Sequence, residues 1–284
     1  MTRLPTFALI GAAKSASTAL YDHLRDHPDV WFPKKEIQFF DRDRAWELGP
    51  EFYRQQFEGY PGVAAVGDAT PAMHVPTVAA RMFEVLPDVQ LVAIVRDPVD
   101  RAWSAWQMQV LKGSEPPGRS FEDALGTDPS YVEGGNYAAH LARFDTRYGL
   151  DRTLVLLQED LRADLQGVLA RVCTHIGVPT RTLQSRGDGN HGATPRHRWV
   201  ASATWGLKSL RDRLDRTPFG HVLRHPTVDN LGRTVRDRIA AWNRSTTPPP
   251  KCPEDVRARV LGLWKEDTAA LESRLNRSLA AWRN

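Results

Sequence analysis

The stretch Phe7–Leu20 holds the residue types and spacing that most clearly indicate chemistry. It begins as an apolar run, passes through Gly11 and Lys14, and continues in a helical pattern. We therefore expect a buried strand, a tight turn and the start of a helix. Backbone N–H groups at such a turn, together with the positive end of the helix dipole, form a site for an anionic phosphate group. Lys14 would add positive charge. The hydroxyl residues that could donate hydrogen bonds there are Ser15, Ser17 and Thr18.

The spacing in this stretch departs from the phosphate loop of nucleoside triphosphatases. That loop requires G-x-x-x-x-G-K-[ST]. Here Lys14 comes three residues after Gly11, and no second glycine precedes the lysine. The turn is therefore shorter than one that cradles a triphosphate. An ordinary strand-to-helix turn with a solvated Lys14 is the alternative interpretation.

Arg96 directly follows the clearest strand pattern in the chain. Residues 89–95 are almost wholly apolar, as expected of an interior strand of a parallel sheet covered on both faces. Pro98 suits the first turn of a helix, with Asp97 as its N-cap. Open α/β sheets bind ligands at the carboxyl ends of their strands, so Arg96 is expected at the ligand-binding edge. Ser104 lies eight residues further on, about two helical turns away.

Glu36 is the first candidate for a catalytic carboxylate. It lies between two lysines and the pair Phe39-Phe40, which would anchor the segment in the core while the polar residues face a cleft. A carboxylate in a solvated loop is the alternative interpretation. Asp68 and His74 follow in a later polar segment.

Strand and helix patterns alternate along much of the chain, as in the βαβ units of a parallel sheet. Further strands are expected over residues 29–33, 63–71 and 153–157, and helices over 42–60, 76–86, 137–144, 164–176 and 253–275. The fold class that this pattern predicts is α/β: a P-loop-like parallel sheet flanked by helices, with a helical C-terminal region. The 284 residues suit a single domain over residues 1–284, with a core over about 1–200 and a helical extension over about 201–284.

Composition excludes several classes of function. The net charge of +4 suits an anionic ligand, but the basic residues are too diffuse to predict nucleic-acid binding. Cys173 and Cys252 lie far apart, which predicts neither a disulfide framework nor a metal site. No secretory segment and no stretch of membrane-spanning length is found, so we expect no stable membrane insertion and a cytoplasmic location.

Three blocks in this order resemble the PAPS-dependent sulfotransferases, above all bacterial members and the domains that modify heparan sulfate. The blocks are Gly11-x-x-Lys14-x-x-x-Thr18-x-Leu20, then Lys35-Glu-Ile-Gln-Phe-Phe40, then Leu91 to Pro98 with Arg101 and Ser104. The resemblance implies transfer of a sulfuryl group from PAPS to a hydroxyl or amine, giving PAP. It implies a small-molecule, glycan or lipid acceptor, and it leaves the oligomeric state undefined.

The resemblance also implies roles for individual residues. The loop that binds the 5′-phosphosulfate would be Lys14, Ser15, Ala16, Ser17 and Thr18. The residues that hold the 3′-phosphate would be Arg96 and Ser104, with Gly192 and Arg196 in a later loop that closes over it. Glu36 would be the catalytic base, and Lys14 would assist catalysis as the positive charge near the transferring group.

Two positions depart from the heparan group. Gln38 stands where those enzymes have a histidine, and Asp68-Ala-Thr-Pro71 stands where they have Glu-Lys-Thr-Pro. Ala69 therefore stands where that group has its second active-site lysine. The positive charge near the transferring group would come from Lys14, helped by Lys35. This difference puts a heparan-like acceptor in doubt. His74 is the main rival to Glu36 as the base.

Two other functions remain open at this stage. A P-loop kinase for a small metabolite would need Mg²⁺ and usually the full glycine pattern, which is absent. A non-catalytic nucleotide-binding module would leave Glu36 with a structural role only. Preference for 3′,5′-ADP over ATP without Mg²⁺ would favour sulfuryl transfer over both.

Overall fold

The computed structural model describes residues 3–182, 196, 200, 238–239, 242–243 and 250–283. The chain divides into two compact units. The first takes the described residues of Met1–Arg101, Val132–Asn190 and Leu261–Asn284, and the second takes those of Ala102–Tyr131 and His191–Val260. A single domain with a helical extension stays a prediction.

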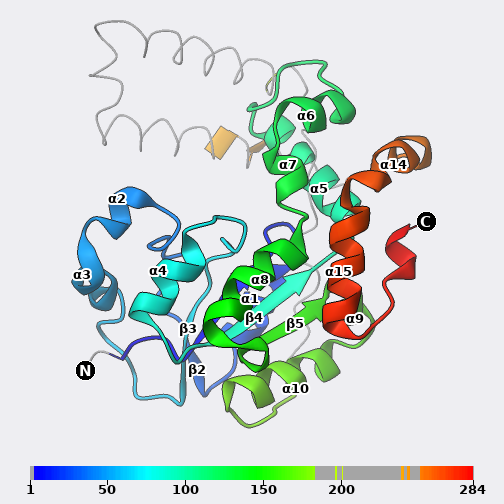
Figure 1. Ribbon diagram of the computed structural model, residues 1–284. Helices are drawn as coiled ribbons and strands as arrows, with labels where there is room; N and C mark the ends of the chain where they lie inside the picture. Colours follow the sequence, from blue (N-terminus) through cyan, green and yellow to red (C-terminus); the bar gives the residue numbers. More distant parts are fainter. Residues whose placement is uncertain are drawn as a thin grey trace, which may run out of the picture. The chain divides into compact units, whose positions relative to one another are not determined.

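A parallel sheet forms the centre of the first unit (Figure 1). Its five strands are β1 (Phe7–Gly11), β2 (Val30–Trp31), β3 (Ala65–Asp68), β4 (Gln90–Val95) and β5 (Thr153–Leu157), in the order β2-β3-β1-β4-β5. In the register, Ala8 pairs with Asp68 on one side and with Leu91 on the other. The predicted α/β class, a parallel sheet flanked by helices, is confirmed.

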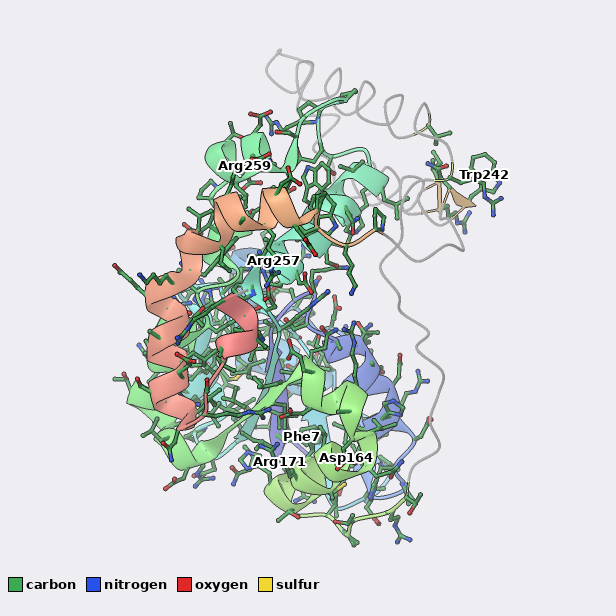
Figure 2. The ribbon with its side chains drawn as sticks, turned by 90° about the vertical axis from the view of Figure 1, so that its right-hand side faces the viewer. Phe7, Asp164, Arg171, Trp242, Arg257 and Arg259 are labelled. Atoms are coloured by element: carbon green, nitrogen blue, oxygen red, sulfur yellow. The ribbon has the colours of Figure 1, made fainter. Side chains whose placement is uncertain are left out.

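Helices cover both faces of this sheet because its central strands are apolar on both faces. The helices α1 (Ser17–Arg25) and α10 (Leu165–Ile176) pack on one face, where Phe7 and Leu9 of β1 point. The helices α4 (Val78–Val85), α8 (Tyr137–Tyr148) and α15 (Lys265–Leu275) pack on the other face, which receives Ala8 and Ile10. Phe7 lies inside the first unit (Figure 2). Asp164, also labelled in Figure 2, caps α10, because its side chain accepts a hydrogen bond from Gly167 N–H (2.8 Å).

Two helices that the sequence predicts as continuous are interrupted. The helix expected over 42–60 is two short ones, α2 (Asp43–Trp46) and α3 (Gly49–Gln55), because Gly49 adopts φ +81° and Pro50 has no N–H to donate. The helix expected over 253–275 is α14 (Glu254–Val260), a 3₁₀ turn over Leu261–Trp264, and α15. Trp264 is buried at this break, and its indole N–H donates to the Val132 carbonyl (2.8 Å).

The last long helix is attached to α8 through charged side chains. The carboxylate of Asp267 accepts hydrogen bonds from the N–H groups of Ala138 and Ala139 (3.0 Å each) and so caps the start of α8. Arg274 donates two hydrogen bonds to Asp145 (2.7 Å each), and both side chains are largely buried. Residues far apart in the sequence therefore hold α8 in place.

The remaining described elements are short, apart from α5 (Pro98–Leu111), which continues from the first unit into the second. They are α6 (Phe121–Thr127), α7 (Ser130–Glu133), α9 (Gln158–Ala163) and two 3₁₀ turns, η1 (Leu150–Arg152) and η3 (Ala280–Arg283). Within the second unit the rings of Trp103, Trp106 and Phe121 contact one another, and Arg259, labelled in Figure 2, pairs with Glu122. Of the helices that the structure describes, none is both long enough and apolar enough to cross a membrane.

Candidate active site at the carboxyl edge of the sheet

The turn between β1 and α1 has the backbone shape of an anion-binding loop. Its first residue, Gly11, is required because a Cβ there would lie 2.5 Å from the Met73 side chain. Lys14 and Ala16 both adopt φ 72°, the left-handed region. Such a conformation costs a residue other than glycine on the order of 1–3 kcal/mol and is concentrated at functional sites. Left-handed residues alternating with right-handed ones also aim successive N–H groups into one concavity.

The first turn of α1 is left open to an external anion. Its N-cap is Ala16, whose methyl group cannot accept a hydrogen bond, and no acidic residue lies in the first turn. The N–H groups there, and the positive end of the helix dipole, have no carboxylate of their own helix to satisfy them. This arrangement favours a phosphate site over an ordinary strand-to-helix turn.

Ser15 and Tyr137 lie beneath the turn. The side chain of Ser15 is fully buried, whereas Ser17 and Thr18 are partly exposed. The hydroxyl of Tyr137, at the start of α8, lies beside Ser15 and the backbone of Arg96, and burial raises the pKa of Tyr137 to about 12. Within the described part of the chain, neither hydroxyl has a hydrogen-bond partner. Sequence reasoning missed Tyr137; the glycine pair Gly134-Gly135 before it was a hint of close packing.

Glu36 is exposed on a loop whose apolar residues are buried. Ile37, Phe39 and Phe40 face the core, and the rings of Phe39 and Phe40 lie 4.9 and 4.8 Å from that of Tyr53. The predicted anchoring by the phenylalanine pair is confirmed. Glu36 itself adopts φ 58°, a further left-handed residue other than glycine.

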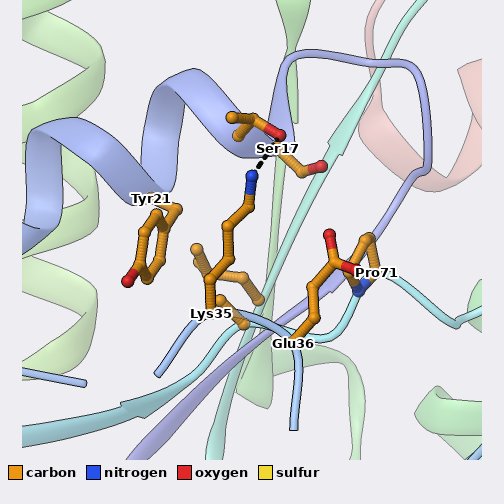
Figure 3. A pocket seen from close by; sticks show the side chains of 8 residues that line it. Ser17, Tyr21, Lys35, Glu36 and Pro71 are labelled. Atoms are coloured by element: carbon orange, nitrogen blue, oxygen red, sulfur yellow. Dashed lines mark hydrogen bonds between the residues drawn. The ribbon is translucent and has the colours of Figure 1, made fainter. Parts of the chain in front are cut away.

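One pocket joins the Glu36 loop to the start of α1 (Figure 3). It is lined by Leu9, Ser17, Thr18, Tyr21, Lys35, Glu36, Ala69 and Pro71. Lys35 and Glu36 extend into it from the same loop, and the ammonium of Lys35 donates to Thr18 Oγ1 (2.9 Å) and lies 5.8 Å from the centre of the Tyr21 ring. The structure thus brings Glu36 together with Ser17 and Thr18. Sequence reasoning gave Lys35 only a helping role and did not foresee this hydrogen bond.

Arg96 follows β4 at the same edge of the sheet. Asp97 accepts a hydrogen bond from the N–H of Asp100 (3.0 Å), so its predicted role as the N-cap of α5 is confirmed. The guanidinium of Arg96 is partly buried and donates to the carboxylate of Asp100 (3.0 Å), a partner that sequence reasoning missed. Ser104 lies one turn beyond Asp100 on α5, in the second unit.

The later predicted loop is only partly described. The N–H of Arg196 donates to the Asn243 carbonyl (2.6 Å) within the second unit. Gly192 lies outside the described residues.

His74, the rival base, follows the pocket residue Pro71. Arg143 donates to the carbonyl oxygens of Met73 (3.0 Å) and His74 (3.1 Å). Partial desolvation of its ring, with the positive charges of Arg101 and Arg143, lowers the pKa of His74 below its ordinary value, although the residue as a whole is exposed. His74 is therefore neutral near pH 7 and chemically able to accept a proton.

Comparison with known proteins finds similarity to sulfotransferases over part of the chain. Residues 73–182 match the family model described as Sulfotransferase family. The chain is 32% identical over 186 residues to heparan sulfate glucosamine 3-O-sulfotransferase 3B1 of Mus musculus, a match that covers 62% of this chain and 47% of that protein. Over these residues the chain is similar to sulfotransferases. The predicted resemblance to the PAPS-dependent sulfotransferases is thereby confirmed.

Two further matches extend this comparison. The chain is 34% identical over 139 residues to the membrane-associated sulfotransferase kil1 of Dictyostelium discoideum, a match that covers 46% of this chain and 29% of that protein. Its fold is that of the sulfotransferase from Alicyclobacillus acidocaldarius, with a TM-score of 0.70, 24% identity, and coverage of 99% of this chain and 100% of the other. The chain spans about half the length of the curated 3-O-sulfotransferases it matches.

Proposed function

We propose that this protein transfers the sulfuryl group of PAPS to a hydroxyl or amine of an acceptor and releases PAP. One observation carries the proposal: an uncapped helix start, preceded by left-handed residues, shares a single pocket with the carboxylate of Glu36 and the ammonium of Lys35. The pocket therefore offers an anion site, a base and a cation together.

The donor end of the site is assigned to the turn before α1. Lys14, Ala16, Ser17 and Thr18 bind the 5′-phosphosulfate through backbone N–H groups, hydroxyls and the lysine charge. Ser15 belongs to this loop by sequence, but its side chain is buried, so it contributes through the shape of the turn. PAPS supplies the sulfuryl group.

The 3′-phosphate of the donor is assigned to Arg96 and Ser104, with Gly192 and Arg196 as the further residues that the resemblance implies. Family resemblance supports these four assignments. Arg96 also has a partly buried guanidinium at the ligand-binding edge of the sheet. Because Asp100 already accepts a hydrogen bond from Arg96, the phosphate shares this guanidinium with a carboxylate.

The chemistry follows from the pocket. The acceptor oxygen attacks sulfur, and the new S–O bond forms as the bond from sulfur to the phosphate oxygen breaks. The electron pair of the broken bond stays on the phosphate of PAP, where Lys14 and Lys35 stabilise the negative charge. The acceptor proton passes to the carboxylate of Glu36, a transfer worth roughly 10²–10⁴-fold in rate.

The acceptor is a small molecule, a glycan or a lipid with a reactive hydroxyl or amine. The 3-O-sulfotransferases are named for heparan sulfate glucosamine, but Ala69 here lines the pocket where the heparan group has lysine, which argues against the same acceptor. A bacterial, cytoplasmic protein remains part of the proposal, although one relative is membrane-associated by name.

Two measurements test this function. Calorimetry without Mg²⁺ should give tighter binding of 3′,5′-ADP than of ATP, and labelled PAPS with a panel of acceptors should give labelled product and PAP. A kinase would require ATP with Mg²⁺, and a binding module would bind 3′,5′-ADP without turnover. Either of those results would refute sulfuryl transfer.

A further inference from the structure

A buried carboxyl group lies at the end of β3, next in the chain to the pocket residue Ala69. The side chain of Asp68 is almost completely buried. It accepts one hydrogen bond from the hydroxyl of Tyr53 (2.8 Å, to Oδ2) and one from that of Thr70 (2.7 Å, to Oδ1). Burial raises the pKa of Asp68 to about 6. Sequence reasoning gave this carboxyl no role beyond its place in the motif.

The hydroxyl of Thr70 links Asp68 to the Glu36 loop. Because its hydrogen is donated to Asp68, its oxygen is left to accept, and it accepts from the backbone N–H of Gln38 (3.3 Å). Thr70 is itself buried. A side chain fixed from behind by a carboxyl group therefore holds the backbone two residues after Glu36.

The Glu36 loop needs such a restraint. Glu36 and Gln38 adopt φ 58° and 56°, and each left-handed residue costs on the order of 1–3 kcal/mol unless the surroundings impose it. Phe39 and Phe40 fix the far end of the loop by packing on Tyr53, the residue that also bonds Asp68. Thr70 supplies a polar restraint nearer to Glu36.

We propose that Thr70, oriented by Asp68, is a positioning residue that holds the Glu36 carboxylate in the pocket through the N–H of Gln38. This rests on the proposed function, since it assigns Thr70 to the reaction that Glu36 assists. A positioning residue affects the catalytic step while the donor site stays intact, because misplacing a catalytic group by about 1 Å costs up to roughly 100-fold in rate.

The test compares Thr70→Val, which keeps the shape but loses the hydroxyl, with Thr70→Ser, which keeps the hydroxyl. The reaction measured is release of PAP from PAPS with water as the acceptor. We expect Thr70→Val to lower kcat at least tenfold and to leave the Kd for PAP within twofold. Thr70→Ser should stay within threefold of the wild type. In a Glu36→Gln background, Thr70→Val should cause no further loss, because the two residues act as a unit.

Tyr53→Phe is the matched control. Like Thr70→Val, this variant removes one hydrogen bond to Asp68, so the midpoint of its urea unfolding should fall by a similar amount. Unlike Thr70→Val, it keeps the hydrogen bond between Thr70 and the N–H of Gln38. We expect its kcat to stay near the wild-type value. Hydrogen exchange of the Gln38 amide should quicken in Thr70→Val alone, a readout that needs no turnover. If Thr70→Val does not fold, Thr70→Ala takes its place with the same expectations.

The outcomes separate two failures. A folded wild type that never releases PAP from PAPS, with water or with any acceptor, overturns the proposed function. An active wild type with equal losses in Thr70→Val and Tyr53→Phe, or with no loss in Thr70→Val, overturns the positioning role alone. Additive losses in the Glu36→Gln background overturn it as well.

Discussion

Replacing Asp68 by asparagine should stabilise this protein at neutral pH. The carboxyl is buried and its pKa is raised to about 6, against 3.8 for an ordinary aspartate. An acid with a raised pKa in the folded state binds its proton more tightly there than in the unfolded chain. Its stabilising contribution is therefore complete below about pH 4 and is lost as the pH rises through about 6.

The magnitude follows from the two pKa values. A difference of about 2 units, at roughly 1.4 kcal/mol per unit, makes ionisation of Asp68 cost about 3 kcal/mol of folding free energy at pH 7.5. At pH 4.5 the same relation gives about 1 kcal/mol. Asparagine cannot ionise, yet its oxygen can still accept from Thr70 and its NH₂ group can donate to Tyr53.

Urea unfolding at a series of pH values measures this difference directly. The free energy of unfolding of Asp68→Asn minus that of the wild type should grow by about 2 kcal/mol from pH 4.5 to pH 7.5, with equal m values. Asp160→Asn is the control, and its stability difference from the wild type should change with pH in the opposite direction. The reason is that the hydrogen bond from Arg277 lowers the pKa of Asp160. A flat difference curve for Asp68→Asn would refute the assignment of a buried, ionisable carboxyl.

Four other substitutions test the site. Glu36→Gln should lower turnover by roughly 10²–10⁴-fold with little change in the Kd for PAP; near-normal turnover together with an inactive His74→Ala would make His74 the base. Lys14→Ala should lower kcat more than the affinity for PAP, since its charge matters most as the leaving oxygen becomes negative; equal losses would make it a ground-state anchor. Lys35→Met should lower kcat about tenfold and make turnover less sensitive to salt. An unchanged kcat would exclude a catalytic role for Lys35. Arg96→Ala should weaken PAP binding by about 1–3 kcal/mol in calorimetry, the worth of a hydrogen bond to a charged group; unchanged affinity in a folded variant would remove Arg96 from the site.

Local patterns predicted the elements that carry the site. The apolar run before Arg96 is a strand, and Asp97-Pro98 starts a helix, because both depend on residues within a few positions. The pair Gly49-Pro50 also indicates the interruption between α2 and α3. The aromatic residues around this pair led to the prediction of one continuous helix. The fold class could be predicted because these short-range patterns locate the strands and helices of the sheet.

Contacts between distant segments could not be predicted from the same patterns. The bond from Lys35 to Thr18, the approach of Tyr137 to Ser15 and the pairing of Tyr53 with Asp68 depend on how strands and helices pack. No spacing rule joins such residues, since tertiary packing decides which side chains meet. The roles assigned to the site residues stay predictions, and Gly192 lies outside the described residues.

The capping of α8 by α15 has a consequence for how the chain is made. The N–H groups of Ala138 and Ala139 acquire their acceptor, Asp267, only after more than a hundred further residues have been added. During synthesis the sheet and the pocket can assemble early, but the start of α8, which carries Tyr137 to the turn before α1, stays uncapped until α15 emerges from the ribosome. Fragments that stop before residue 265 should therefore be prone to proteolysis near Tyr137, and co-expression of the missing helix should protect them.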